Sequence, residues 1–136
     1  MTRPDGRLAM AFWTPDGFIG QMLRACASLV PLPAGVASPR EWGVEDVVRE
    51  RFRGGFKSVS CTTRILQLRF PFPPAAVTEL FATSYGPTLA TLRATDGDGK
   101  NQLREELTRL FQQHNLAING TTTVVGEYLD VQARVA

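Results

Sequence analysis

Apolar residues follow one another almost without a break over residues 7–13, which read Arg-Leu-Ala-Met-Ala-Phe-Trp. A run in which apolar and polar positions do not alternate is typical of a strand buried on both faces of a parallel sheet. A turn containing proline and glycine, residues 3–6, precedes the run, and a Pro-Asp-Gly turn, residues 15–17, ends it. The pattern therefore predicts a buried strand at 7–13 with neighbours on both sides.

Apolar residues recur at helical spacing in four later segments, which prolines and glycines separate. The first, residues 18–30, has a broad apolar stripe, which predicts that most of its surface is covered. A short helix is predicted after Gly43, with its last apolar residue at Phe52. Residues 77–85 form the apolar face of a third helix, and the Gly-Pro pair at 86–87 is predicted to end it. A turn at 96–99 is predicted to precede the fourth helix, which carries apolar residues from 103 onward.

Two further segments have the composition of strands. Residues 58–70 are rich in β-branched side chains and alternate from Arg64 onward, which predicts a half-exposed strand that prolines 71, 73 and 74 terminate. An Asn-Gly turn at 119–120 precedes the last predicted strand, residues 121–135. The expected order is strand, two helices, strand, two helices and strand, in a single α/β domain over residues 1–136.

Composition excludes several classes of protein. The chain has 136 residues, of which 43% are hydrophobic and 21% charged, and a formal net charge of +2. Its cationic residues are scattered along the sequence, so no footprint for nucleic acid is expected. The longest apolar run is far shorter than the roughly 20 residues of a membrane-spanning helix. Cys26 and Cys61 form no C-x-x-C motif, and no signal peptide precedes them, which favours a reduced, cytoplasmic compartment over a secreted or zinc-binding protein.

Few residues suggest chemistry by themselves. The Asp-Gly-Asp-Gly sequence at 96–99 begins like a calcium loop, but the glycine and glutamate that such a loop needs at its sixth and twelfth positions are missing, so a helix cap is expected. His114 is the only histidine, which excludes a multi-histidine metal site and favours a role in packing or capping. Cys61 lies in mid-strand beside no evident base, which favours a structural role. No glycine-rich phosphate-binding loop occurs.

Several stretches together resemble one family. Residues 3–10 and 12–15 are similar to the turn and fifth strand of class I S-adenosylmethionine-dependent methyltransferases, in which an R-P-G-G-R-L turn leads into the strand. Asp5 stands here in place of the first glycine of that pair. Residues 38–43, 81–87 and 127–129 resemble the C-terminal half of small-molecule methyltransferases of the ubiquinone/menaquinone-methylase-like type.

The resemblance implies a Rossmann-like sheet containing strands five to seven of the family, with helices between the sixth and seventh strands and the last strand antiparallel. The family binds S-adenosylmethionine through a glycine-rich turn after its first strand and an acidic residue at the end of its second. Neither has a counterpart here, so no cofactor binding and no activity are expected of this chain alone, and no catalytic residue is assigned. Aromatic residues near the carboxyl end of the first strand are the candidates for a substrate pocket: Trp13, Phe18, Trp42 and Tyr85, with Tyr128 as a further pocket-lining aromatic.

The partners expected from this resemblance are a small-molecule methyl acceptor and a second protein surface. The strand at 7–13 would have an uncovered edge, so a homodimer or a partner chain is expected to cover it. A non-catalytic ligand-binding or dimerisation module derived from the same fold is the alternative. An unrelated small α/β domain that binds an apolar ligand is a third interpretation.

Overall fold

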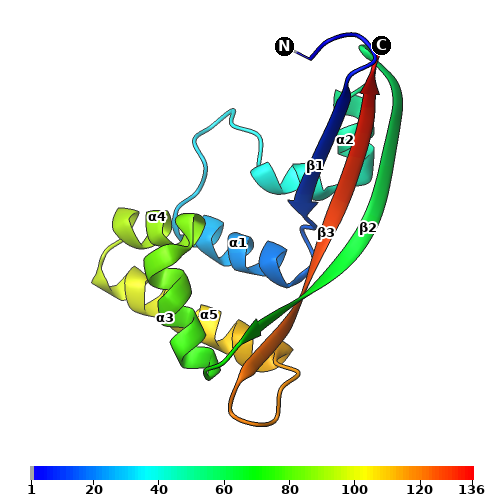
Figure 1. Cartoon of the computed structure of the whole chain (residues 1–136). Helices are drawn as coiled ribbons and strands as arrows, with labels where there is room; N and C mark the ends of the chain where they lie inside the picture. Colours follow the sequence, from blue (N-terminus) through cyan, green and yellow to red (C-terminus); the bar gives the residue numbers. More distant parts are fainter. Residues whose placement is uncertain (1) are drawn as a thin grey trace.

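Three strands and five α-helices make up the part of the chain that the computed structural model describes, residues 2–136 (Figure 1). The strands are β1 (Arg7–Trp13), β2 (Phe56–Phe70) and β3 (Thr122–Val135). Helix α1 (Phe18–Leu29), a 3-10 helix (Pro39–Gly43) and α2 (Glu45–Arg51) lie between β1 and β2. Helices α3 (Pro74–Ser84), α4 (Gly86–Ala94) and α5 (Gly97–His114) lie between β2 and β3. The α/β class expected from the sequence is therefore confirmed.

The last strand of the chain is the central strand of the sheet. The order is β1-β3-β2, and β3 is antiparallel to both neighbours. The expected antiparallel last strand is therefore confirmed, and β1 and β2 run in the same direction on either side of it. The pairing of β2 with β3 is unbroken from Ser58 to Phe70, so these two long strands form a twisted antiparallel pair, although three helices separate them in the sequence (Figure 1).

The prediction that β1 is buried on both faces of a parallel sheet is wrong. β1 pairs with β3 alone, in the antiparallel direction, and its residues alternate between exposed and half-buried. Leu8, Met10 and Phe12 pack against a core, whereas Ala9 and Ala11 lie on an exposed face. Small alanine side chains make the run apolar in sequence, yet they are compatible with exposure because little apolar area is left in water.

Strand β3 buries opposite faces at its two ends. Successive residues of a strand point to opposite faces, so Val124 and Leu129 lie on different sides of the sheet. Val124 belongs to the core formed with α1, α3, α4 and α5, whereas Leu129 and Val131 belong to a second core with β1 and α2. Helices consequently cover opposite faces at the two ends of β3. In Figure 1, α1, α3, α4 and α5 lie beside the lower end of the sheet and α2 beside its upper end.

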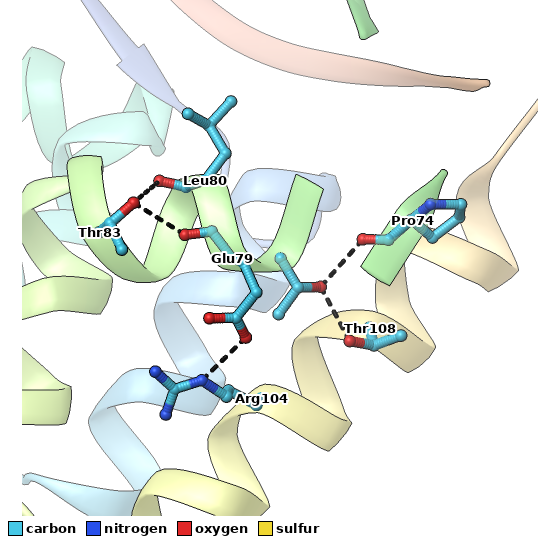
Figure 2. A network of polar contacts seen from close by, with 7 residues as sticks. Pro74, Glu79, Leu80, Thr83, Arg104 and Thr108 are labelled. Atoms are coloured by element: carbon cyan, nitrogen blue, oxygen red, sulfur yellow. Dashed lines mark hydrogen bonds and ion pairs between the residues drawn. The ribbon is translucent and has the colours of Figure 1, made fainter. Parts of the chain in front are cut away.

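Polar contacts link α3 to α5 where both helices reach the first core (Figure 2). The Thr108 hydroxyl donates to Thr78 Oγ1 at 2.9 Å, and the Thr78 hydroxyl donates to the Pro74 carbonyl oxygen at 3.2 Å. On the exposed side, Arg104 Nε lies 2.9 Å from Glu79 Oε1. Thr78 is almost completely buried, so this network satisfies the polar atoms of a side chain within the core.

The prediction that a helix ends at Gly86 and Pro87 is confirmed, because α3 ends immediately before them, but the same two residues also begin α4, a helix that the sequence pattern does not predict. Helix α3 ends at Ser84, Tyr85 is extended with φ −89° and ψ 115°, and Pro87 occupies the first turn of the next helix. Proline is favoured there because its missing N–H and fixed φ suit a helix start. The expected cap at the turn 96–99 is confirmed, since Asp96 Oδ1 accepts a hydrogen bond from the Gly99 amide at 2.8 Å.

No helix within residues 2–136 combines the length and the apolar character that crossing a membrane requires.

Replacing Gly43 by alanine should destabilise the fold. A Cβ at this position would lie 2.1 Å from the Trp13 carbonyl oxygen, so the 3-10 helix would have to move away from β1. We expect the free energy of unfolding in urea to fall by about 1–3 kcal/mol. Gly86→Ala is the matched control, because a Cβ there meets nothing within 4 Å, and its unfolding should change little. Equal stability of the two variants would contradict the close approach.

Candidate functional site

The carboxyl end of β1 is held tightly by residues distant in the sequence. The Thr14 amide donates to the Glu127 carbonyl oxygen at 3.0 Å, and the Thr14 hydroxyl donates to the Glu127 carboxylate at 2.7 Å. The Trp13 ring packs over Gly126, where a Cβ would lie 2.8 Å from a ring carbon. These contacts hold the end of β1, and the start of the turn that leads into α1, against β3.

This turn does not have the form of a cofactor cradle. A Cβ at Gly20 would lie 2.2 Å from the Thr14 carbonyl oxygen and 2.3 Å from that of Pro15. The space that glycine leaves is thus filled by the chain's own backbone, not open to a ligand. The Asp16 carboxylate is exposed and pairs with Arg24 at 3.0 Å. The residues present at this strand end do not fit S-adenosylmethionine, and we derive no step that involves it.

Two separate hollows lie near the predicted pocket residues. Trp13 and Tyr128 meet edge to face with ring centroids 6.1 Å apart. With Leu66 they line an open hollow of about 320 Å³ on the exposed face of the sheet. Tyr85 lines a different cavity, also of about 320 Å³, between α1, α4 and the segment that joins α1 to the 3-10 helix. The structure therefore does not bring Trp13 and Tyr85 together.

The other two predicted pocket residues pack within the cores. Phe18 is 2% exposed and packs against Phe111 and His114, with ring centroids 5.0 and 5.3 Å away. Trp42 stacks on Phe12 at 5.3 Å, and the Arg51 guanidinium lies 4.3 Å from its ring centroid. Neither Phe18 nor Trp42 lines the cavity beside Tyr85.

The cavity beside Tyr85 is mainly apolar, with a few polar groups in its lining. Leu23 and the C-cap residue Val30 form the α1 side of the cavity. Leu32 comes from the connecting segment, Pro39 from the start of the 3-10 helix, and Pro87 from the start of α4. Cys26 and Thr91 are the buried polar members of the lining. An apolar cavity with a small number of placed polar groups is the usual form of a small-molecule site. We therefore take this cavity, which we call the Tyr85 cavity, as the candidate functional site.

The acidic groups of the Tyr85 cavity are held in their neutral forms. Burial raises the pKa of the Cys26 thiol, and the nearby Thr91 and Thr88 hydroxyls offset only part of this effect. Burial also raises the pKa of the Tyr85 phenol, with a smaller contribution from Cys26. At neutral pH the thiol is a weak nucleophile, because the thiolate is the reactive form. The cavity is thus suited to binding and not to thiol chemistry.

Thr88, which lies near Cys26, is a buried polar group without a partner in the described chain. Its side chain is 0% exposed, and Oγ1 makes no hydrogen bond to any residue of the described chain. The neighbouring Cys26 thiol is a weak acceptor, and its contact with Thr88 lacks hydrogen-bond geometry. Thr91 differs, because its hydroxyl donates to the Pro87 carbonyl oxygen at 2.9 Å.

The sequence interpretation named Tyr85 but missed Cys26, Thr88 and Thr91 as neighbours. Thr88 and Thr91 are three residues apart, a spacing that places both on one face of a helix. The sequence pattern predicts no helix directly after the Gly-Pro pair, so this spacing does not identify the two residues as neighbours. The contact of Cys26 with α4 joins segments about 60 residues apart, and no local pattern specifies it.

The remaining candidates have structural surroundings. His114 ends α5 and packs on Phe18. Cys61 is half-buried on β2 beside the second core, and burial raises the pKa of its thiol although Arg49 lies nearby. Across residues 2–136, no group of three or more His, Cys, Asp or Glu side chains is placed to hold a metal ion.

Removing the Thr88 hydroxyl should stabilise the protein. In Thr88→Val, a methyl group replaces a buried oxygen that has no partner, so we expect the free energy of unfolding to rise by about 1 kcal/mol. Thr78→Val is the matched control in the neighbouring helix, because it leaves the Thr108 hydroxyl without its acceptor and should lower stability by about 1 kcal/mol. Urea unfolding of both variants measures the difference. A loss of stability in Thr88→Val would show that its hydroxyl is satisfied in solution.

The chain is similar in sequence to several uncharacterized mycobacterial proteins. No family model matches the chain. The uncharacterized protein Rv1403c of Mycobacterium tuberculosis is 30% identical over 116 residues, which are 82% of this chain and 42% of that protein. The uncharacterized protein Mb1438c of Mycobacterium bovis is similar to the same extent. A further M. tuberculosis protein, Rv1405c, is 28% identical over 88 residues, 64% of this chain and 32% of its own length. The chain thus spans less than half the length of these curated relatives.

Proposed function

We propose that this chain is the substrate-side region of an S-adenosylmethionine-dependent methyltransferase of small molecules, and that the Tyr85 cavity holds the apolar part of the methyl acceptor. The observation that carries the proposal is the position of α3, α4 and α5 between β2 and an antiparallel β3. The sequence resemblance implies this arrangement, in which helices separate the last two strands and the last strand is antiparallel.

The chain's own residues would contribute positioning and exclusion of water. Methyl transfer in a complete enzyme depends on holding the acceptor in line with the methyl group and on removing water around it. An apolar cavity lined by Leu23, Val30 and Tyr85 suits both tasks. No residue of the cavity is assigned as a general base, because Cys26 and Tyr85 are both held neutral by burial.

The free edge of β1 supports the second candidate function, a non-catalytic binding or dimerisation module. The Thr14 amide and the Gly6 carbonyl bond to β3, so even-numbered residues of this segment face β3. The backbone groups of Arg7, Ala9 and Ala11 therefore point away from the sheet. No backbone hydrogen bond within residues 2–136 is made at that edge over these three residues. Such an edge is a template for pairing with another strand.

Calorimetric titration with S-adenosylmethionine tests the methyltransferase proposal. The longer relative Rv1403c should bind the cofactor with micromolar affinity. The 136-residue chain, verified as folded by circular dichroism, should give no binding heat, because backbone atoms fill the space at Gly20. Failure of the relative to bind S-adenosylmethionine or S-adenosylhomocysteine would overturn the proposal. Micromolar binding by the short chain would instead overturn the conclusion that its residues do not fit the cofactor.

Sedimentation at micromolar concentration tests association through β1. We expect a dimer, because pairing of two β1 edges would satisfy the outward backbone groups of Arg7, Ala9 and Ala11. Ala9→Pro removes an outward N–H without touching the bonds to β3, and it should yield monomers. Ala9→Ser is the control, since it keeps the N–H at the same exposed position, and it should remain dimeric. A monomeric parent chain, or a dimer that persists in Ala9→Pro, would exclude this interface.

A further inference from the structure

The Tyr85 cavity has one charged residue in its lining. Arg40, from the first turn of the 3-10 helix, is half-buried where the connecting segment meets the cavity. The other lining residues are aliphatic side chains, prolines, small residues, a thiol, hydroxyls and the Tyr85 ring. A cation in an apolar lining is unusual, because arginine is mostly exposed and is generally paired where it is fully buried.

Arg40 has no carboxylate partner among residues 2–136. Seven arginines, at 24, 49, 51, 53, 64, 104 and 109, each form an ion pair with an Asp or Glu. Within the described chain Arg40 forms none, and the other arginines without an ion pair, at 3, 7, 69, 93 and 134, are exposed and do not line the cavity. The only hydrogen bond found for Arg40 outside regular backbone pairing is from its amide to Ser38 Oγ, at 3.4 Å, and this bond leaves the guanidinium donors free. The cavity therefore presents one guanidinium without an ion-pair partner among the described residues, beside an apolar interior.

We propose that the Tyr85 cavity binds a small apolar carboxylate, with the hydrocarbon part against Leu23, Val30 and Leu32 and the carboxylate at Arg40. Guanidinium presents parallel N–H donors that match the two oxygens of a carboxylate. A neutral ligand of the same shape would bury the apolar walls equally well, but it would leave Arg40 without a counter-charge. The two parts of the site thus select a ligand that is both apolar and anionic.

The cavity volume limits the size of this ligand. At about 320 Å³, the cavity lies at the lower end of the range for small-molecule sites. A chain of about eight carbons or a bicyclic aromatic acid is the largest ligand we expect to be enclosed. The identification of this acid with the methyl acceptor rests on the function proposed above, whereas its binding to the chain requires no cofactor.

Titration of the 136-residue chain with octanoate tests the proposal directly. Octanoate should bind with a dissociation constant at least tenfold lower than that of octanamide, which has the same chain without the charge. Acetate, which carries the charge without the chain, should not bind. Equal affinity for octanoate and octanamide would overturn the role of Arg40. The absence of binding by either would overturn the cavity as a ligand site.

Two arginine variants separate the cavity from general surface charge. Arg40→Gln should weaken octanoate binding about tenfold or more and leave octanamide binding unchanged. Arg93→Gln is the matched control, because Arg93 is exposed on α4, does not line the cavity and forms no ion pair with the described residues. Equal weakening in both variants would show that octanoate responds to net charge and does not occupy this site.

Protection of Cys26 gives a second readout at the cavity itself. In a Cys61→Ala background Cys26 is the remaining thiol, and it lines the cavity. Octanoate should slow its reaction with a thiol reagent, whereas acetate should not. Octanoate binding without protection of Cys26 would place the ligand elsewhere and overturn the assignment. None of these measurements depends on S-adenosylmethionine, so failure of the cofactor titration with Rv1403c would remove the methyl-acceptor role and leave the carboxylate site standing.

Discussion

The rest of the structure depends on β3, whose two halves are covered on opposite faces. Because side chains alternate along a strand, burying Val124 at one end and Leu129 and Val131 at the other requires helices on both sides of the sheet. A single helical layer on one face would leave half of these residues in water. The chain supplies α2 and the 3-10 helix for one face and the four longer helices for the other.

The junction after β1 connects these two parts. Glycines at positions 20, 43 and 126 allow α1, the 3-10 helix and β3 to approach the backbone or ring of the segment Trp13 to Pro15 closely. Glu127 adds a backbone bond and a side-chain bond to Thr14. Close packing of this kind leaves little freedom for α1 to move relative to the sheet. The direction of α1 in turn sets where its second half, with Leu23 and Cys26, meets α4.

The Tyr85 cavity arises where α4 begins. Tyr85 is extended between α3 and α4, and the chain resumes a helix at Pro87, so the phenol ring is placed beside α1 and not within a continuous helix. Thr88 and Thr91 then face Cys26 from the first turns of α4. The break between α3 and α4 thus places Thr91 in the cavity lining. Arg40 comes from the 3-10 helix, which precedes β2 in the sequence.

Local signals in the sequence determined the positions of most elements. Helical spacing located α1, and the Asp96 turn located the start of α5, because capping and periodicity depend on residues only a few positions apart. β-branched residues and prolines located β2, and the Asn-Gly turn located the start of β3. Tyr85 could be named as a pocket candidate because it is one of the large aromatic residues visible in the sequence.

Only the tertiary structure decided which faces are covered and which side chains meet. The sequence of the run at 7–13 is the same whether Ala9 and Ala11 are buried or exposed. In the described chain they are exposed, because no other element covers that face of β1. The Gly-Pro pair follows the end of α3 and also begins α4, and only the packing of α4 on α1 shows that the second helix forms. The meeting of Cys26, Arg40 and Tyr85 in one cavity joins three segments far apart in sequence. Such contacts are fixed by the packing of whole elements, which no local sequence pattern specifies.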